Sequence, residues 1–245
     1  MKCRCFAHRG FSGKYPENTF LAFSKALEAG CEGIELDVQL TKDKELVIIH
    51  DEKIDRTSDK IGFVKDMTYK ELLEADFSYK FRGQVPFQKI PTLREYFELV
   101  SSRDIITNIE LKTGIFEYLG IEKLVYDLIV EFGLKDRVII SSFNHNSVMR
   151  MKALDSDLVC GFLSETWILS PWEYVKSNGA ECYHPEFHML TDSEARALKE
   201  NGIKLNAFTV NEEKDICRMI ELEIDGIISN YPDLVLRLLR EKGLR

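Results

Sequence analysis

The sequence contains no long apolar run, few prolines and few glycines. Its 245 residues include 6 prolines and 14 glycines, which argues against a collagen-like or a disordered chain. No apolar stretch approaches the roughly 18 residues that a membrane-spanning helix needs. Residues 1–7 also lack the apolar region of a signal peptide. We therefore expect a mature chain that begins at its first residue and has no stable membrane anchor.

The sequence also has fewer basic than acidic residues. Lys and Arg number 33 against 41 Asp and Glu, so the net charge is −8. A nucleic-acid-binding protein normally presents a basic face, and this balance therefore argues against nucleic acid as a partner. An anionic small molecule remains a plausible ligand if local positive charge or a metal ion receives it. The oligomeric state is left open by these bulk properties.

The six cysteines lack the spacing of a disulfide framework. Cys3 and Cys5 could suggest a metal site, but they flank Phe6 in a predicted buried strand, where packing is the favoured interpretation. We expect reduced thiols and a cytoplasmic location.

The chain is instead rich in short apolar runs that alternate with amphipathic segments. Strands are predicted at residues 2–8, 33–38, 105–111, 138–142, 158–163, 181–184, 203–210 and 226–229. Helices are predicted at residues 20–29, 92–101, 121–132, 146–154, 171–177, 192–201, 211–221 and 232–240. Such alternation implies parallel strands joined by right-handed crossovers. Eight units in 245 residues predict one α/β domain, a (β/α)8 TIM barrel, rather than an open doubly wound sheet.

Residues 51–90 interrupt the alternation with mixed charge, isolated aromatic residues and one short predicted helix at 68–75. A loop of this length often covers a functional site, so we predict a small inserted subdomain within a single domain at 1–245. No G-x-G-x-x-G or G-x-x-x-x-G-K sequence follows a predicted strand, which argues against a nucleotide-binding fold.

Two extended runs flank a predicted turn at residues 41–45. Alternation places Glu35 and Asp37 on one face of the first run, because strand side chains repeat every two residues. If the second run folds back on the first, Asp37 lies opposite His50. The count of eight barrel strands requires this second run to be the return arm of a hairpin. Acid stands where an apolar strand face is expected, and such a departure from patterning often marks a functional site.

Polar side chains gather at the predicted C-terminal ends of the strands, where a barrel of this kind carries its active site. They are His8, Arg9, Glu35, Asp37, His50, Glu110, Lys112 and His184. The three carboxylates cannot all ionise close together without a counter-charge, and an all-oxygen set favours Mg²⁺ or Ca²⁺ over zinc. We predict that Glu35, Asp37 and Glu110 hold a divalent cation. Simple ion pairs with Arg9 and Lys112 are the alternative.

Two of these histidines, His8 and His50, are candidates for general acid–base catalysis because imidazole titrates nearest neutral pH. Arg9 and Lys112 suit a phosphate, the first as a fork of donors and the second as a point charge. His184 is intermediate between a functional and a structural role.

Other candidates receive a structural interpretation. His145 and His188 fall in predicted loop or helix-start positions. Trp167 and Trp172 flank a proline on the predicted active rim, where they either line a substrate pocket or, more commonly, pack within the loop.

A series of motifs runs from residue 8 to about residue 233. The motifs are His8-Arg9-Gly10, Pro16-Glu17-Asn18-Thr19, Glu35-Leu36-Asp37-Val38, His50-Asp51, Asp55-Arg56-Thr57, Ile90-Pro91-Thr92-Leu93, Glu110-Leu111-Lys112, Thr209-Val210-Asn211 and Asp225-Gly226-Ile227-Ile228. In content, order and spacing this series resembles that of the glycerophosphodiester phosphodiesterases. The resemblance implies a barrel with an inserted subdomain and metal-dependent hydrolysis of glycerophosphodiesters to glycerol 3-phosphate and an alcohol.

The resemblance also implies roles for individual residues. Glu35, Asp37 and Glu110 match the family's metal ligands, His8 and His50 its acid–base pair, and Arg9 and Lys112 its phosphate contacts. It further suggests that a glycerol hydroxyl attacks first and that water then opens a cyclic phosphate.

The chain departs from the family pattern at two positions. Phe208 stands where Trp is common, which keeps an apolar wall for the substrate but allows a different alcohol preference. Asn230 stands where Asp is usual and removes one carboxylate near the last strand. Lysophospholipase D-like and phospholipase C-like activities are alternatives at the same site, as is a non-catalytic barrel that binds phosphodiesters.

Overall fold

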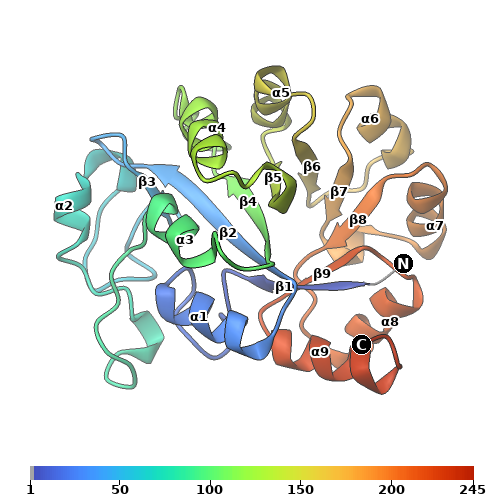
Figure 1. Ribbon diagram of the computed structural model, residues 1–245, viewed down its shortest axis with the longest axis horizontal. Coiled ribbons are helices and arrows are strands. Elements are labelled where there is room, and N and C mark those ends of the chain that lie inside the picture. The colour runs from blue at the N-terminus through green and yellow to red at the C-terminus, as the bar shows by residue number, and fades with distance from the viewer. Residues whose placement is uncertain (1–2) are drawn as a thin grey trace.

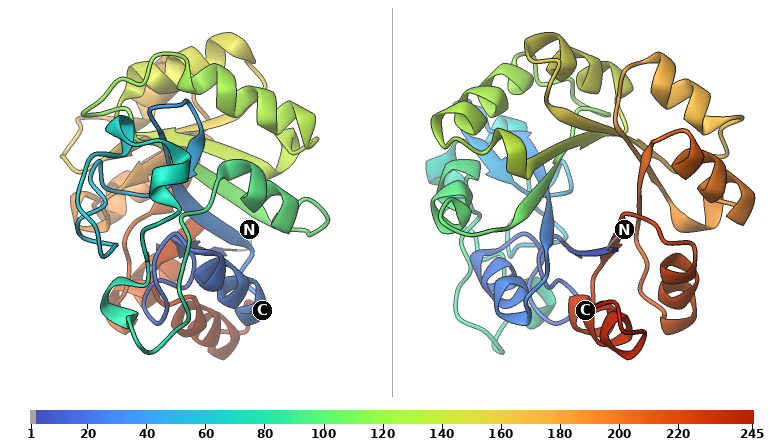
Figure 2. Two further views of the ribbon diagram at one scale, coloured as in Figure 1. Left: turned by 90° about the vertical axis from the view of Figure 1, so that its left-hand side faces the viewer. Right: turned by 45° about the vertical axis from the view of Figure 1, so that its right-hand side comes forward.

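The computed structural model describes residues 3–245, in which eight parallel strands close into a barrel surrounded by helices (Figure 1, Figure 2). The strand order is β1-β9-β8-β7-β6-β5-β4-β2, and parallel pairing of β1 with β2 closes the ring. Each barrel strand is followed along the chain by a helix that covers the outside of the barrel. The predicted (β/α)8 barrel is confirmed.

The predicted elements lie close to those observed. The barrel strands are β1 (Arg4–His8), β2 (Gly33–Leu40), β4 (Ile106–Leu111), β5 (Val138–Ser142), β6 (Val159–Ser164), β7 (Cys182–Pro185), β8 (Lys204–Ala207) and β9 (Gly226–Ser229). The covering helices are α1 (Phe20–Ala29), α3 (Leu93–Val100), α4 (Ile121–Glu131), α5 (His145–Leu154), α6 (Pro171–Ser177), α7 (Asp192–Glu200), α8 (Glu213–Glu221) and α9 (Pro232–Glu241). The predicted start of the first strand at Lys2 lies outside the described residues.

The two-residue period of β2 separates two environments. Ile34 and Leu36 are fully buried in the main apolar cluster, together with residues of the surrounding helices. The intervening positions face the barrel interior, where Gly33 lies against Phe6. A Cβ atom at Gly33 would come within 2.2 Å of the Phe6 ring, so only glycine allows this close approach. The same alternation points Glu35 inward.

The first helix shows how local sequence sets the element boundaries. Thr19 caps α1, its hydroxyl accepting a hydrogen bond from the backbone N–H of Ala22. Gly30 ends the helix in the left-handed region, at φ 83°. The two ends of α1 are therefore set by capping interactions within the local sequence.

The hairpin after β2 is present, but its predicted register is wrong. β3 (Leu46–Ile48) runs antiparallel to β2 outside the barrel, as the strand count required. Val38 pairs with Ile48, which places Asp37 opposite Ile49 rather than His50. The cause is the turn, in which the backbone N–H of Thr41 bonds to the carbonyl of Glu45 and shifts the register by one residue. His50 instead follows the strand onto the rim.

Residues 51–90 lie beside β3 and α3, at the left of Figure 1. They contain the short helix α2 (Tyr69–Leu72) and two 3₁₀ turns, at Val64–Asp66 and Tyr79–Phe81. Their apolar side chains form a second cluster with the hairpin arm, composed of Val47, Ile49, Ile54, Val64, Leu72, Ala75, Phe77 and Ile90. This cluster anchors the segment next to the rim that carries His50. No helix in residues 3–245 is both long and apolar enough to cross a membrane.

Candidate active site

Inward-facing side chains of β1, β2 and β4 meet at the C-terminal end of the barrel. The register places His8 beside Glu35 and Asp37 beside Glu110. One carboxylate oxygen from each of the three acids lies within 4.8 Å of the other two, and all three residues are buried. The described residues therefore contain an acidic cluster that could bind a metal ion, and this is the trio that the sequence predicted as ligands.

The three carboxylates perturb one another. Burial, with the charges of Asp37 and Glu110, raises the pKa of Glu35 well above its usual value. Burial also raises the pKa of Glu110. The pKa of Asp37 is held below its usual value because Arg9 and other cations outweigh the effect of burial. Asp37 Oδ1 is buried and has no hydrogen-bond partner among residues 3–245. Oxygen donors, crowded negative charge and a buried oxygen that accepts no hydrogen bond from the described residues all fit a hard divalent cation.

Arg9 organises one side of the cluster. It lies directly after β1 at φ 56°, and its backbone N–H donates to Glu35 Oε2 at 3.0 Å. Its guanidinium lies 3.4 Å from Asp37 Oδ2 and donates to Glu17 Oε1 at 2.9 Å. The side-chain amide of Asn18 donates to the same Asp37 oxygen at 2.8 Å. Strained backbone of this kind often accompanies a functional site.

His8 points its Nε2 toward the acids, 3.9 Å from Glu35 Oε2. Its Nδ1 lies 2.6 Å from Asn230 Oδ1, which also accepts a hydrogen bond from Ser12. An amide oxygen only accepts, so this contact puts the neutral-state proton on Nδ1. Burial, reinforced by the charge of Arg9, lowers the pKa of His8 to about 3. His8 is therefore neutral at neutral pH.

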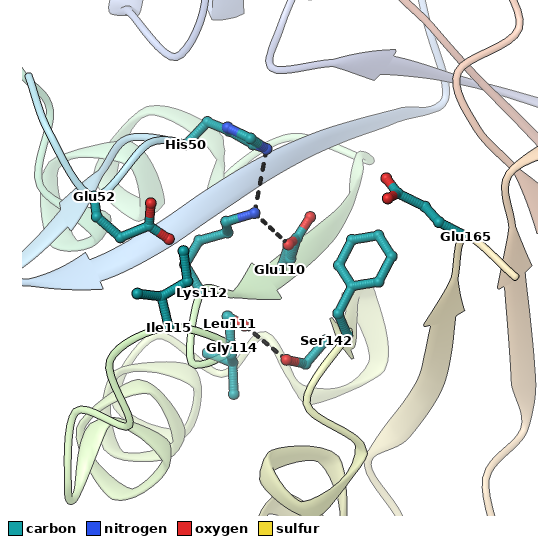
Figure 3. Close-up of a pocket in the computed structure, with 10 residues that line it drawn as sticks. His50, Glu52, Glu110, Leu111, Lys112, Gly114, Ile115, Ser142 and Glu165 are labelled. Atoms are coloured by element: carbon teal, nitrogen blue, oxygen red, sulfur yellow. Dashed lines mark hydrogen bonds and ion pairs between the residues drawn. The ribbon is translucent and has the colours of Figure 1, made fainter. Parts of the chain in front are cut away.

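His50 approaches from the other side, held between an acid and a cation. Its Nδ1 donates to Asp51 Oδ1 at 2.7 Å, and its Nε2 lies 3.2 Å from Lys112 Nζ (Figure 3). Lys112 also donates to Glu110 Oε1 at 2.8 Å. These contacts bring His50 and Lys112 to the same rim as the acidic cluster.

Two cavities adjoin this cluster. The larger, about 310 Å³, opens at the rim; its lining residues are His50, Glu52, Glu110, Leu111, Lys112, Gly114, Ile115, Ser142, Phe143 and Glu165 (Figure 3). The smaller, about 20 Å³, lies further in; its lining residues are His8, Glu35, Asn108, Glu110, Leu163, Phe208 and Ile228. Phe208, predicted as a substrate contact, thus lines the inner cavity beside His8.

The geometry agrees with comparisons to known proteins. Residues 8–234 match the sequence model of the Glycerophosphoryl diester phosphodiesterase family. The chain belongs to this family. The predicted family and the predicted enzyme class are both confirmed.

Relatives in this family cover almost the whole chain. A glycerophosphodiester phosphodiesterase of Caldanaerobacter subterraneus subsp. tengcongensis is 43% identical, over 99% of this chain and 100% of its own. A phosphodiesterase of Oleispira antarctica, solved in complex with the product sn-glycerol-3-phosphate, is 28% identical with a TM-score of 0.86 over 98% of this chain and 97% of its own. A glycerophosphodiester phosphodiesterase of Thermotoga maritima is 30% identical with a TM-score of 0.77, over 97% and 99%.

Besides Asn18, three residues of the family motifs that sequence reasoning left without a role contact the candidate site residues, directly or through one another. Glu17 pairs with Arg9, and Asp51 pairs with His50. Arg56, from the inserted segment, donates to both of these carboxylates at 2.6–3.0 Å. The available signal was their membership of the motif series, in which Asp51 directly follows His50.

The remaining histidines lie away from the cluster. His184 is buried inside the barrel on β7, where Asn206 Nδ2 donates to its Nε2 at 2.9 Å, and burial lowers its pKa to about 3. His145 lies between the carbonyl of Leu163 and the hydroxyl of Tyr174, each at 2.8 Å. Neither His184 nor His145 lines the two cavities that adjoin the cluster.

The two tryptophans do not line either cavity. Trp172 packs against the main apolar cluster from α6, as the loop-packing interpretation suggests. Trp167 is 55% exposed in the loop before α6. The wall of the larger cavity is formed by Phe143 and Ile115 instead.

Proposed function

We propose that this protein hydrolyses glycerophosphodiesters to glycerol 3-phosphate and an alcohol, with Mg²⁺ or Ca²⁺ as its cofactor. The observation that carries the proposal is the meeting of three buried carboxylates, two imidazoles and two cationic side chains at one end of the barrel. The product bound to the Oleispira relative supports the assignment of glycerol 3-phosphate.

Glu35, Asp37 and Glu110 would hold the cation, because their oxygens are the donors that Mg²⁺ and Ca²⁺ prefer. When bound, the cation would neutralise the negative charge that builds on the phosphoryl group. The residues around the trio would fix these carboxylates: Arg9 and Asn18 hold Asp37, and Lys112 holds Glu110.

Arg9 and Lys112 would bind and orient the phosphate. Their positive charges lie on either side of the acidic cluster, one after β1 and the other after β4. Arg9 offers a planar fork of donors and Lys112 a compact charge, and the two together leave a phosphodiester little freedom of orientation.

His8 would take the proton from the nucleophile. The inner cavity beside it has room for about one hydroxyl group or water molecule. His8 is neutral there because burial and Arg9 lower its pKa to about 3. Its Nε2, free of the Asn230 contact, would accept the proton as a glycerol hydroxyl forms a bond to phosphorus.

His50 would give a proton to the departing alcohol. It lines the larger cavity, where an alcohol can leave toward solvent, and Asp51 orients its ring. As the bond from phosphorus to the alcohol oxygen breaks, His50 would protonate that oxygen. Water would then open the cyclic phosphate with the two proton transfers reversed, so that one water is consumed overall.

The test is release of glycerol 3-phosphate from glycerophosphocholine, glycerophosphoethanolamine and glycerophosphoglycerol, with Mg²⁺ or Ca²⁺ and after exhaustive EDTA. We expect chelation to abolish turnover and His8→Ala or His50→Ala to reduce it by about 10²–10⁴-fold. His188→Ala, an exposed histidine that pairs with Glu186, is the matched control and should retain turnover.

Three results would contradict the proposal. No release from any of the three substrates would refute the activity itself. Full turnover after chelation would refute the metal role of Glu35, Asp37 and Glu110. An accumulating cyclic phosphate, detected by phosphorus NMR, would identify a lyase in place of a hydrolase.

A further inference from the structure

The larger cavity extends beyond the groups assigned to phosphate and proton transfer. His50, Glu110 and Lys112 occupy one part of its wall. A glycerophosphodiester whose phosphate contacts Lys112 would place its alcohol along the rest of the cavity. The composition of that remaining wall therefore decides which alcohol is accepted.

Two acidic side chains enter the cavity from opposite sides (Figure 3). Glu52 belongs to the segment after β3, and Glu165 to the loop after β6. Unlike Glu110, which pairs with Lys112, neither side-chain carboxylate has a hydrogen-bond or ion-pair partner among residues 3–245. Their negative charges are therefore available to a bound molecule.

The cavity also has an apolar and aromatic wall. Phe143 is 38% exposed, and its ring packs edge-on against Phe208 with 5.8 Å between centroids. The ammonium of Lys112 already lies 6.0 Å from the centroid of the Phe143 ring. Ile115 adds an exposed aliphatic surface. An aromatic face attracts a cation, and apolar side chains suit its methyl groups.

We propose that this cavity selects glycerophosphodiesters whose alcohol carries a positively charged ammonium group, as choline and ethanolamine do. The inference rests on the proposed function and names the substrate class of the same site. A cationic alcohol compensates Glu52 and Glu165, whereas a neutral polyol leaves both carboxylates unpaired and an anionic alcohol is repelled. The apolar wall of Phe143 and Ile115 favours the methylated ammonium of choline among the cationic alcohols.

The experiment compares two substrates that differ only in charge. One is glycerophosphocholine; the other is its 3,3-dimethylbutyl analogue, in which carbon replaces the quaternary nitrogen. For the unmodified enzyme we expect kcat/KM to favour glycerophosphocholine by about tenfold. Glu52→Gln and Glu165→Gln should each lower this ratio by about two- to fivefold, and the double variant should bring it near one.

Glu117→Gln is the matched control. Glu117 lies on the loop after β4, 3.5 Å from Arg150 and outside the cavity lining, so its loss should leave the ratio as in the unmodified enzyme. The neutral analogue serves as an internal reference for folding and turnover in every variant. A ratio near one in the unmodified enzyme, or an unchanged ratio in the double variant, would overturn the inference. Absence of turnover with both substrates would instead refute the proposed function.

Discussion

Asn230 holds His8 in place with a neutral group. Its Oδ1 is 2.6 Å from His8 Nδ1 and 3.0 Å from the Ser12 hydroxyl. An amide oxygen provides the same hydrogen bond as a carboxylate but adds no negative charge to favour the imidazolium. The Asp-to-Asn departure that the sequence revealed therefore preserves the orientation of His8 and leaves it neutral.

Asn230→Asp should change the pH profile of the enzyme. An adjacent carboxylate favours protonated His8 and should raise its pKa by about one to three units. His8 must be neutral to accept a proton in the proposed mechanism. On acidification, the variant should therefore lose kcat/KM at a higher pH than the unmodified enzyme does. Measuring kcat/KM from pH 3 to 9 should show the acidic limb of the variant displaced upward from that of the unmodified enzyme, in which His8 has a pKa of about 3.

Asn211→Asp is the control for added charge. Asn211 accepts hydrogen bonds from the hydroxyl of Ser229 and the backbone N–H of Asn230, and it does not contact His8. Its acidic limb should move less than that of Asn230→Asp. Superimposable profiles for Asn230→Asp and the unmodified enzyme would exclude His8 as the general base.

At the scale of elements, the inserted segment is tied to the barrel through Arg56. Its guanidinium donates to both oxygens of Asp51 and both oxygens of Glu17. Asp51 orients His50, and Glu17 holds Arg9. One side chain thus couples the position of the segment to the two sides of the candidate active site.

Arg56→Lys should reduce kcat by about 10- to 100-fold, because a lysine cannot bridge two carboxylates with a planar fork. A positioning role predicts a loss in kcat larger than any rise in KM. Steady-state kinetics on glycerophosphocholine, with circular dichroism to verify folding, measures this split.

Arg82→Lys is the matched change within the same segment. Arg82 pairs with Asp59 and Asp76 and touches neither Glu17 nor Asp51, so its turnover should be near that of the unmodified enzyme. Equal kcat values for Arg56→Lys and Arg82→Lys would show that Arg56 does not position the site.

At the scale of the whole molecule, three buried carboxylates lie close together inside the barrel. Glu35, Asp37 and Glu110 lie on adjacent strands β2 and β4, and their mutual repulsion opposes the pairing of those strands. A bound cation would remove this repulsion in the folded state alone. The thermal stability of the protein should therefore depend on divalent cation.

Mg²⁺ or Ca²⁺ at about 100 times its Kd should stabilise the protein by about 2.7 kcal/mol, which raises Tm by roughly 5–10 °C for a chain of this size. Differential scanning fluorimetry with and without EDTA measures the change. The rise should disappear in Glu110→Gln. It should persist in Glu122→Gln, which removes a buried acid paired with Arg150 elsewhere. A Tm insensitive to either cation would contradict binding at this cluster.

Much of the site could be read from the sequence, because the barrel repeats one local rule. The alternation of β2 places Ile34 and Leu36 outside and Glu35 and Asp37 inside, whatever the rest of the chain does. Parallel strands then present their C-terminal ends at one rim, so His8 and Glu110 had to join these acids. The fold, the acidic trio and the location of His8 follow from this periodicity, whereas His50 follows the hairpin arm outside the barrel.

Only the tertiary structure decided the partners of these groups. The pairing of Asp37 with Ile49 depends on the hydrogen bonding of one turn. The sequence alone does not distinguish this register from one shifted by a single residue, because the apolar residues of the return arm fit both. Asn230 reaches His8 across 222 residues, and Arg56 reaches Glu17 from the inserted segment. Loop sequences have no periodic pattern from which such contacts can be predicted. The contacts form because the closed barrel and the packing of the inserted segment bring these distant residues together.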